Sequence, residues 1–266
     1  MSSSSAPQVV LVTGGTRGIG VGIARVFVGA GAAVVVCGRD SAVGEAAAEE
    51  VDRSGPGNCR FIQCDVTKSE DNERLVHSTI ETMGRLDCLV NNAGWHPPYV
   101  PIDELSVSGF SDLLRLNLIS YFELCKLALP FLRQTHGTII NVSSLVGEIG
   151  QECACTYTAT KGGINALTKS LAIDEARHGV RVNVVLPGAI ETPLYREYVD
   201  TQPDPQEAER ETNRWQWMGR VGRAEEVGYL CLFLSGEGAS FVTGAAIPVS
   251  GGAELGYGLK RVPGLS

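Results

Sequence analysis

The stretch Thr13-Gly14-Gly15-Thr16-Arg17-Gly18-Ile19-Gly20 decides the fold of this 266-residue chain. It directly follows the apolar run 9–12 and opens a helical pattern from about residue 19 to residue 30. Between a strand and a helix, Gly14 permits a tight turn, Gly18 lets backbone approach a pyrophosphate, and Gly20 permits close helix packing. The N–H groups and the positive dipole end of the helix N-terminus then suit an anion. The stretch predicts a dinucleotide-binding loop, although plain turns also use glycine.

Short apolar runs alternate with longer amphipathic stretches along the rest of the chain. Runs rich in Val and Ile are typical of strands buried on both faces, and alternation with helices indicates a parallel sheet. The expected strands cover residues 9–12, 33–37, 61–64, 86–90, 138–142, 180–185 and 245–249, and the expected helices cover about 19–30, 42–51, 70–83, 110–133 and 157–177. The sequence predicts one α/β domain over residues 1–266, with a Rossmann-type doubly wound parallel sheet of about seven strands and helices on both faces.

Three segments fall outside this alternation. We expect residues 1–7 to be flexible and residues 253–266 to form a C-terminal tail. The irregular segment 192–220 contains three prolines and two tryptophans. A loop of this length inside a compact domain is usually a lid or binding loop, so we expect a substrate lid there.

Composition excludes several classes of partner. The net charge is −8, and no basic run is present, which argues against nucleic acid. The longest apolar run, 32–37, is far shorter than the roughly 20 residues that span a bilayer. The start, Met1 to Ser5, has no signal-peptide features, so we expect a cytoplasmic chain in which the eight cysteines are reduced. The four histidines lack metal-ligand spacing, and we expect no metal.

Tyr157 and Lys161 are four residues apart at the start of an expected helix and therefore share one face. A free phenol has a pKa of about 10, which a neighbouring ammonium lowers towards the range useful for proton transfer. Ser144 follows the expected strand 138–142 and can donate a hydrogen bond to a substrate oxygen, while Ser143 points the other way.

Polar residues follow two other strands at the same carboxyl edge of the sheet, where open α/β folds bind ligands. Asp65, in Cys64-Asp65-Val66, either accepts a hydrogen bond from an adenine amino group or caps the next helix. The stretch Asn91-Asn92-Ala93-Gly94 follows the next strand.

Together, the glycine loop, Asn91-Asn92-Ala93-Gly94, Ser144, Tyr157-x-x-x-Lys161 and Pro187-Gly188 resemble the short-chain dehydrogenase/reductase family over residues 9–252. The resemblance implies hydride transfer between NAD(P) and a secondary alcohol or ketone. It also implies that Tyr157 is the acid/base, that Lys161 lowers its pKa and holds the ribose, and that Ser144 orients the carbonyl. Asn117 matches the family residue that holds a water in the proton relay; alternatively, it is a helix-interior Asn bonded to backbone. The implied cofactor-binding residues are Gly14, Thr16, Arg17, Gly18, Ile19, Gly20, Arg39, Asp65, Val66, Asn91, Ala93, Gly94, Tyr157, Lys161, Pro187, Gly188, Ile190 and Thr192.

Within the family, the stretches 86–98, 143–151 and 251–258 are most similar to the type 14 branch of the 17β-hydroxysteroid dehydrogenases. This similarity implies a lipophilic, 17β-hydroxysteroid-like substrate. A sugar or polyol is the alternative, and a non-catalytic nucleotide-binding sensor or scaffold is an alternative of another class. The implied substrate residues, which loop packing explains equally well, are His96, Gln151, Leu194, Tyr195 and Trp215.

Gly38 stands where NAD-using members of that branch carry an acidic residue that would repel a 2′-phosphate. With Arg39 beside it and Arg17 in the glycine loop, the sequence favours NADP(H). NAD(H) is the alternative if the chain follows its relatives or if Asp40 acts as that acid. The patterns 110–133 and 157–177 resemble the helices by which family members form homodimers and homotetramers.

Overall fold

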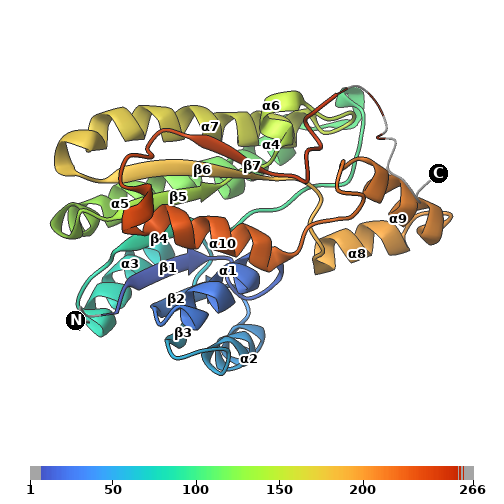
Figure 1. Ribbon diagram of the computed structural model, residues 1–266. Coiled ribbons are helices and arrows are strands. Elements are labelled where there is room, and N and C mark those ends of the chain that lie inside the picture. Colours follow the sequence, from blue (N-terminus) through green and yellow to red (C-terminus); the bar gives the residue numbers. More distant parts are fainter. Residues whose placement is uncertain (1–6, 257, 259, 261–266) are drawn as a thin grey trace.

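The computed structural model describes residues 7–256, 258 and 260. Seven parallel strands form a single sheet in the order β3-β2-β1-β4-β5-β6-β7, which confirms the expected doubly wound α/β domain (Figure 1). The order reverses between β1 and β4, and open α/β sheets bind ligands beyond the carboxyl ends of the strands at such a point. The strands are β1 (Val9–Thr13), β2 (Ala33–Gly38), β3 (Asn58–Gln63), β4 (Cys88–Asn91), β5 (Thr138–Val142), β6 (Arg181–Pro187) and β7 (Ala246–Val249).

Helices cover both faces of the sheet (Figure 1). One face packs against α1 (Gly18–Gly29), α2 (Ser41–Asp52) and α10 (Ala224–Ser235), and the other against α3 (Ser69–Met83), α5 (Ser120–Thr135) and α7 (Cys155–Glu175). The remaining helices are α4 (Val107–Leu114), α6 (Val146–Ile149), α8 (Pro193–Asp200) and α9 (Pro205–Arg214), with short 3-10 turns at Ile102–Glu104, Ala176–His178 and Glu237–Ala239 and a π-helix at Arg115–Ile119.

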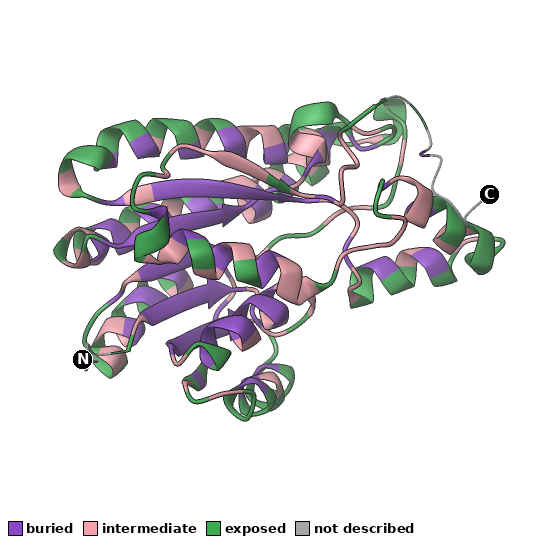
Figure 2. Ribbon diagram, viewed as in Figure 1, coloured by how far each residue is buried: buried purple, intermediate pink, exposed green. Residues whose placement is uncertain are grey.

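The sheet is buried on both sides because its strands are apolar at successive positions. In β1, Val10 and Val12 join the cluster that contains Phe27 of α1, whereas Val9 and Leu11 join the cluster on the opposite face. Successive side chains of a strand point to opposite faces, so one apolar run supplies both cores. Figure 2 shows the result, with the central strands buried along their length and the outer helices exposed on one side.

Helix α10 is missing from the expected helices, and it packs closely on α1. A Cβ added at Gly22 would lie 2.4 Å from the Ala224 Cβ, and one added at Gly228 would lie 2.9 Å from the Val26 Cγ2. Glycine at both positions therefore lets the two helix backbones approach each other.

The segment 192–220 is more regular than the sequence predicts, because it contains α8 and α9. Each of these helices has proline at its first position, preceded by a residue whose side chain caps the helix. Thr192 accepts a hydrogen bond from the Tyr195 N–H at 3.1 Å, and Asp204 accepts one from the Glu207 N–H at 3.0 Å. A capping residue followed by proline indicates the start of a helix, and the prediction of an irregular loop did not take this signal into account. The role of the segment as a lid remains a prediction.

Several smaller expectations have different outcomes. All eight cysteines are free thiols, and six are buried, but Cys153 and Cys155 are exposed. Within the described part of the chain, no helix is both long and apolar enough to cross a membrane. The expected flexible N-terminus lies outside the described residues except for residue 7, as do residues 257, 259 and 261–266 of the expected tail.

Candidate active site

The glycine loop joins β1 to α1 at the edge where the strand order reverses. Gly14 and Gly18 have φ angles of +60° and +57°, which favour glycine. A Cβ at Gly14 would lie 2.9 Å from the Ala93 Cα, and one at Gly20 would lie 2.3 Å from the Gly14 carbonyl oxygen. The N-cap residue Arg17 makes no side-chain capping bond, so its side chain leaves the N-terminal N–H groups of α1 open. This geometry fits the pyrophosphate of a dinucleotide.

Thr13 and Asn92 hold the glycine loop against the loop that follows β4. The Thr13 Oγ1 accepts hydrogen bonds from the N–H groups of Asn92 and Ala93, both at 3.0 Å. The Asn92 Nδ2 donates to the carbonyl oxygens of Thr13 at 2.9 Å and Gly14 at 3.2 Å. Neither residue is among the candidate site residues from the sequence. Their position directly beside the candidate cofactor-binding residues Gly14, Asn91 and Ala93 was the one sequence feature that could have identified them.

The side chain of Asn91 is engaged within the protein, and its contact with the dinucleotide remains a prediction. Its side chain is buried between β4 and β5, where its Nδ2 donates to the Asn141 Oδ1 at 3.0 Å and to the Cys125 Sγ at 3.3 Å. The Asn141 Nδ2 in turn donates to the Thr168 Oγ1 at 2.9 Å. Through Asn141, the Asn91 side chain therefore links the sheet to α7.

The loop after β3 contains Asp65 and the buried Val66. The Asp65 Oδ1 accepts hydrogen bonds from the N–H of Thr67 at 3.1 Å and from its hydroxyl at 2.7 Å. This Asx turn fixes the loop, and Asp65 does not cap α3, whose N-cap is Lys68. Contact between Asp65 and adenine remains a prediction.

Ser144, Tyr157 and Lys161 converge beyond the end of β5. Tyr157 is the third residue of α7, and Lys161 lies one turn later, with its Nζ 5.6 Å from the centre of the Tyr157 ring. The Nζ donates to the Val142 carbonyl oxygen at 3.0 Å. The Ser144 hydroxyl lies close enough to Tyr157 to lower the pKa of its phenol, whereas the Ser143 hydroxyl donates to the Lys161 carbonyl oxygen at 2.9 Å. The two adjacent serines thus serve different partners, as their alternation predicts.

Burial sets the pKa values of this group. It raises the pKa of Tyr157 to about 12, and the neighbouring Ser144 hydroxyl acts in the opposite direction. Burial also lowers the pKa of Lys161 to about 7. The sequence predicts a lowered phenol pKa. In the protein without a bound dinucleotide, the pKa of Tyr157 is raised instead, because the cost of burying the phenolate outweighs the effect of the Ser144 hydroxyl.

Asn117 lies in the π-helix Arg115–Ile119, between α4 and α5, and is fully buried. Its Oδ1 accepts from the Trp95 N–H at 3.0 Å, and its Nδ2 donates to the Trp95 carbonyl oxygen at 3.0 Å and to the Thr160 Oγ1 at 3.2 Å. Asn117 thus joins the loop after β4 to α7 beside Tyr157. Both interpretations of Asn117 therefore remain open, because it bonds to backbone and also lies near the expected acid/base. Its place in a π-turn favours a functional role, since such turns are frequent at functional sites.

His96 and Gln151 come together over the Tyr157 ring. The centre of the His96 ring is 4.2 Å from that of Tyr157, and the His96 Nε2 lies 3.1 Å from the Gln151 Oε1. The Gln151 Nε2 donates to the Tyr99 hydroxyl at 3.1 Å, and the Tyr99 ring is 5.8 Å from that of Tyr198 in α8. The sequence does not identify Tyr99 and Tyr198 as site residues, because no motif surrounds them.

The other substrate candidates lie on or after α8 and α9. Leu194 is 46% exposed, Tyr195 is buried, and Trp215 follows the last residue of α9. Tyr195 faces Arg196, whose guanidinium lies 5.5 Å from its ring centre. These three residues are therefore elements of the helical segment, and their contact with substrate remains a prediction.

The segment after β6 returns to the glycine loop. Gly188 donates its N–H to the Val249 carbonyl oxygen at 3.0 Å, and the buried Ile190 forms an isolated bridge with Gly222. A Cβ at Gly18 would lie 3.4 Å from the Thr192 Cγ2. Thr192 therefore borders the glycine loop, as a residue near the nicotinamide would.

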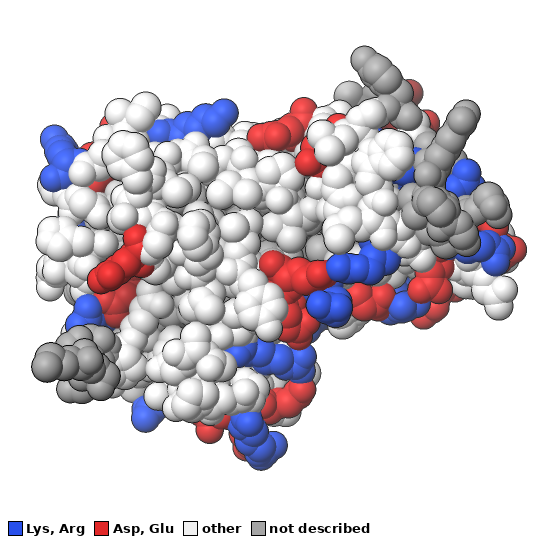
Figure 3. Space-filling model, viewed as in Figure 1, with Lys and Arg blue, Asp and Glu red and all other residues white. Residues whose placement is uncertain are grey.

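Gly38, at the end of β2, leaves room for the Thr16 side chain. A Cβ at Gly38 would lie 2.9 Å from both the Thr16 Oγ1 and Cγ2. Arg17 and Arg39 are exposed, and Asp40 accepts a hydrogen bond from the Val43 N–H at 3.0 Å as the N-cap of α2. Among the described residues, neither arginine has an ion-pair partner, whereas acidic and basic side chains stand side by side around α8 and the start of α10 (Figure 3).

Comparisons with known proteins agree with this geometry. A family model described as Enoyl-(Acyl carrier protein) reductase matches residues 14–254. L-fucose dehydrogenase of Bos taurus is 52% identical over 260 residues, which cover 98% of this chain and 94% of that protein. The structure of the aldohexose dehydrogenase of Thermoplasma acidophilum matches with a TM-score of 0.85 and 30% identity, covering 96% of this chain and 97% of that chain. Levodione reductase matches with a TM-score of 0.90 and 29% identity, covering 94% and 98%.

Fold and site together define an oxidoreductase that uses NAD(P) and acts on CH–OH groups. The chain belongs to the short-chain dehydrogenase/reductase family. The finer similarity to the type 14 hydroxysteroid branch is not confirmed, because the matched proteins carry the names of L-fucose and aldohexose dehydrogenases.

Proposed function

We propose that the chain oxidises a hydroxyl group of a monosaccharide, with NAD(P) as hydride acceptor, and catalyses the reverse reaction on the corresponding carbonyl. The observation that carries this proposal is the hydrogen-bonded series His96–Gln151–Tyr99 against the ring of Tyr157. The names L-fucose dehydrogenase and aldohexose dehydrogenase among its relatives support it.

The polar series suits a ring that carries several hydroxyl groups. An imidazole, an amide and a phenol offer both donors and acceptors, and each can exchange its present partner for a substrate hydroxyl. A steroid skeleton would cover these groups without replacing their hydrogen bonds, which costs free energy. A lipophilic alcohol is the second candidate, because Leu194, Trp217 and Met218 expose apolar side chains at 46%, 48% and 66%.

Tyr157 is the proposed acid/base, and Ser144 the proposed donor to the substrate oxygen. During oxidation the Tyr157 phenolate accepts the hydroxyl proton, while Ser144 holds the same oxygen. The bound nicotinamide dinucleotide supplies the hydride acceptor. With its pKa near 12, Tyr157 needs further positive charge beside it to ionise at neutral pH. Lys161, with a pKa near 7, supplies that charge when it is protonated. Asn117 is proposed to hold the water through which the proton leaves.

We also propose NADP(H) as the preferred dinucleotide. Thr16 occupies the space in which an acidic side chain at residue 38 would begin, and Asp40 is already engaged as a helix cap. Arg17 and Arg39 then remain available for a 2′-phosphate.

A homodimer or homotetramer is proposed on the apolar side chains that α5 and α7 expose. Phe122 is 51% exposed, and Ile173 is 78% exposed. Light scattering that gives the mass of a monomer would refute this assembly.

A substrate panel tests the activity. L-fucose, aldohexoses, cyclic secondary alcohols and hydroxysteroids are each offered with NAD and with NADP, and nicotinamide absorbance at 340 nm reports turnover. We expect turnover of a sugar, and we expect Tyr157→Phe to lower kcat by about 10²- to 10⁴-fold with dinucleotide affinity unchanged. Turnover of steroids alone would refute the sugar assignment, and an active Tyr157→Phe would refute the role of the phenol.

A further inference from the structure

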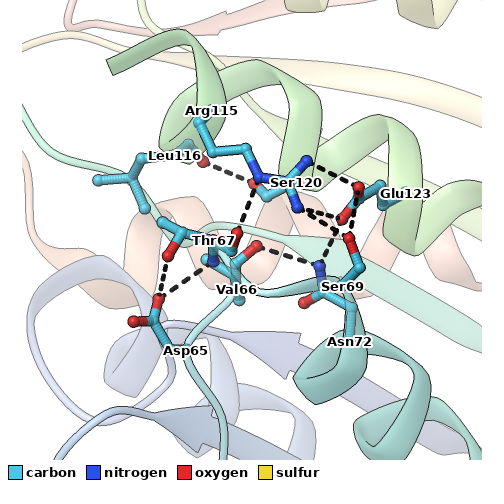
Figure 4. Close-up of polar contacts among 9 residues, drawn as sticks. All are labelled: Asp65, Val66, Thr67, Ser69, Asn72, Arg115, Leu116, Ser120 and Glu123. Atoms are coloured by element: carbon cyan, nitrogen blue, oxygen red, sulfur yellow. Dashed lines mark hydrogen bonds and ion pairs between the residues drawn. The ribbon is translucent and has the colours of Figure 1, made fainter. Parts of the chain in front are cut away.

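Arg115 is the first residue of the π-helix that contains Asn117, and it makes four hydrogen bonds (Figure 4). Its Nη1 and Nη2 donate to the two carboxylate oxygens of Glu123 at 2.7 and 3.1 Å. Its Nε donates to the Thr67 carbonyl oxygen at 2.8 Å, and its Nη2 also donates to the Ser69 Oγ at 2.9 Å. One guanidinium therefore contacts α5, the start of α3 and the loop after β3.

Glu123 closes the network from the other side. Its carboxylate also accepts hydrogen bonds from the Asn72 Nδ2 at 2.9 Å and the Ser69 Oγ at 3.1 Å. Burial opposes ionisation, but the hydrogen bonds from Arg115, Asn72 and Ser69 together hold the pKa of Glu123 below its usual value. The Asn72 Nδ2 further donates to the Val66 carbonyl oxygen at 3.0 Å, so the loop 65–67 is held at two points.

The spacing of Arg115 and Glu123 depends on the π-helix between them. Eight residues of α-helix turn through about 800°, which is about 80° more than two full turns. Arg115 and Glu123 would then lie on different faces of a regular helix. The i→i+5 bonds of a π-turn widen one turn by about one residue, which brings positions eight apart close to the same face. The bidentate contact between the two side chains therefore matches the π-helical register better than the α-helical one.

Asn117 depends on the same register. It lies two residues after Arg115, and its bonds to Trp95 and Thr160 require its side chain to point towards the loop after β4 and towards α7. In a regular α-helix, every residue after the lost bulge would rotate by about 100° relative to those before it. The side chain of Asn117 would then lose its alignment with one of its partners.

We propose that Arg115, paired with Glu123, is a positioning residue that holds the π-helical register and thereby places Asn117, and that its bond to Thr67 couples this register to the loop after β3. The proposal rests on the proposed function, in which Asn117 belongs to the proton path, and on the contact with adenine that the sequence predicts for Asp65. A dinucleotide that orders this loop thus also stabilises the register of the proton path.

A second bidentate pair in the same helix provides the matched control. Arg133, near the end of α5, donates to both carboxylate oxygens of Glu175 at 2.8 and 2.6 Å. It joins α5 to α7 and lies 16 residues after Asn117, more than four helical turns away. Arg133→Lys therefore removes an equivalent bidentate contact without touching the π-helix or the loop after β3.

The test compares Arg115→Lys with Arg133→Lys in the full-length chain. Lysine keeps the charge but loses the planar fork. We expect Arg115→Lys to lower kcat about five- to tenfold, to leave the KM of the sugar unchanged and to weaken dinucleotide binding about threefold. Arg133→Lys is expected to lower the melting temperature comparably with kcat unchanged. Equal kcat losses in the two variants would overturn the proposal, because they would indicate general destabilisation.

A double-mutant cycle distinguishes action through Asn117 from an independent effect. If Arg115 acts through Asn117, Arg115→Lys lowers kcat less than about twofold in an Asn117→Ala background. A full five- to tenfold loss in that background would overturn the proposal and leave the proposed function intact. An unchanged kcat in Asn117→Ala alone would remove Asn117 from the proton path and overturn the proposal, whereas the sugar dehydrogenase activity is tested separately by the substrate panel. Should Arg115→Lys fail to fold, Glu123→Gln, which keeps an acceptor for Asn72, takes its place in the same cycle.

Discussion

The glycine loop after β1 and the loops around Tyr157 border the same site but are built by different means. On the nucleotide side, backbone atoms approach each other so closely that Gly14 and Gly20 cannot carry a side chain. On the substrate side, His96 and Gln151 come from segments 55 residues apart and meet through their side chains. Backbone geometry leaves little freedom to vary, whereas side-chain contacts can be exchanged without moving the chain. We therefore expect the first side to be intolerant of substitution and the second to control specificity.

Among the substitutions that test this contrast, the largest effect is expected on the nucleotide side, from Gly20→Ala. The new Cβ would lie 2.3 Å from the Gly14 carbonyl oxygen, so the loop must shift. We expect the free energy of unfolding to fall by about 1–3 kcal/mol. Dinucleotide binding, measured by calorimetry, is expected to weaken about 10- to 100-fold.

Gly29→Ala is the matched control at the other end of the same helix, because a Cβ there meets nothing within 4 Å. It is expected to leave binding unchanged and to stabilise the fold by up to about 1 kcal/mol. If both variants bind dinucleotide normally, close backbone contact does not define the nucleotide side.

The contrast between the two sides also separates what the sequence could predict from what it could not. The strands, the glycine loop and the pair Tyr157–Lys161 depend on local patterns, namely apolar runs, glycine spacing and a four-residue helical repeat. The contact of His96 with Tyr157 and the core position of Asn91 depend on how distant segments meet, and no local pattern encodes that. No local pattern marks the π-helix at Arg115–Ile119, and α10 is apolar enough to lack a clear helical repeat. The helices α8 and α9, by contrast, carry a local signal, their cap–proline starts.

A smaller effect is expected on the substrate side, from Gln151→Leu. The substitution removes the amide that joins His96 to Tyr99 and places apolar surface beside Tyr157. We expect kcat/KM for the sugar to fall about tenfold, the size of one hydrogen bond to a polar substrate, with dinucleotide affinity unchanged. A cyclic alcohol with a single hydroxyl group is expected to be affected less than twofold.

Gln134→Leu serves as the control, because Gln134 lies near the end of α5 and its side chain, within the described part of the chain, bonds only the Pro130 carbonyl oxygen. An equal loss of kcat/KM for the sugar and the cyclic alcohol in Gln151→Leu would mean that Gln151 supports the fold of the site and does not bind the additional hydroxyl groups of the sugar.

Arg39→Gln, at the border of the nucleotide side, tests whether a side chain sets the preference for NADP over NAD at a site that is otherwise formed by backbone. Arg39 is exposed and without an ion-pair partner among the described residues, so its removal is not expected to disturb the loop. We expect the ratio of kcat/KM for NADP to that for NAD to fall about fivefold through loss of a charged hydrogen bond. Arg53→Gln, on the exposed end of α2, is the matched control and is expected to leave the ratio unchanged. A ratio that is unaffected by Arg39→Gln, or a wild-type preference for NAD, would contradict the NADP(H) proposal.

The smallest effect is expected where the helical segment 192–220 rejoins the domain, at the pair Arg220–Glu226. Both carboxylate oxygens of Glu226 accept hydrogen bonds from Arg220, at 2.7 and 2.9 Å, and these bonds bring the pKa of Glu226 to about 2. A carboxylate whose folded pKa lies below its unfolded value stabilises the fold above the unfolded pKa, here about 4.5, and loses that contribution as the pH falls towards 2. We expect Glu226→Gln to lower the free energy of unfolding by about 1 kcal/mol at pH 7, measured in urea, and we expect this difference from wild type to disappear between pH 4.5 and 2.

Glu237→Gln is the control, because it removes an exposed carboxylate that has no ion pair in the described chain. It is expected to change neither the free energy of unfolding at pH 7 nor its dependence on pH. A difference for Glu226→Gln that persists at pH 2 would assign its effect to helix capping through the Arg223 N–H, which accompanies the ion pair at 2.7 Å.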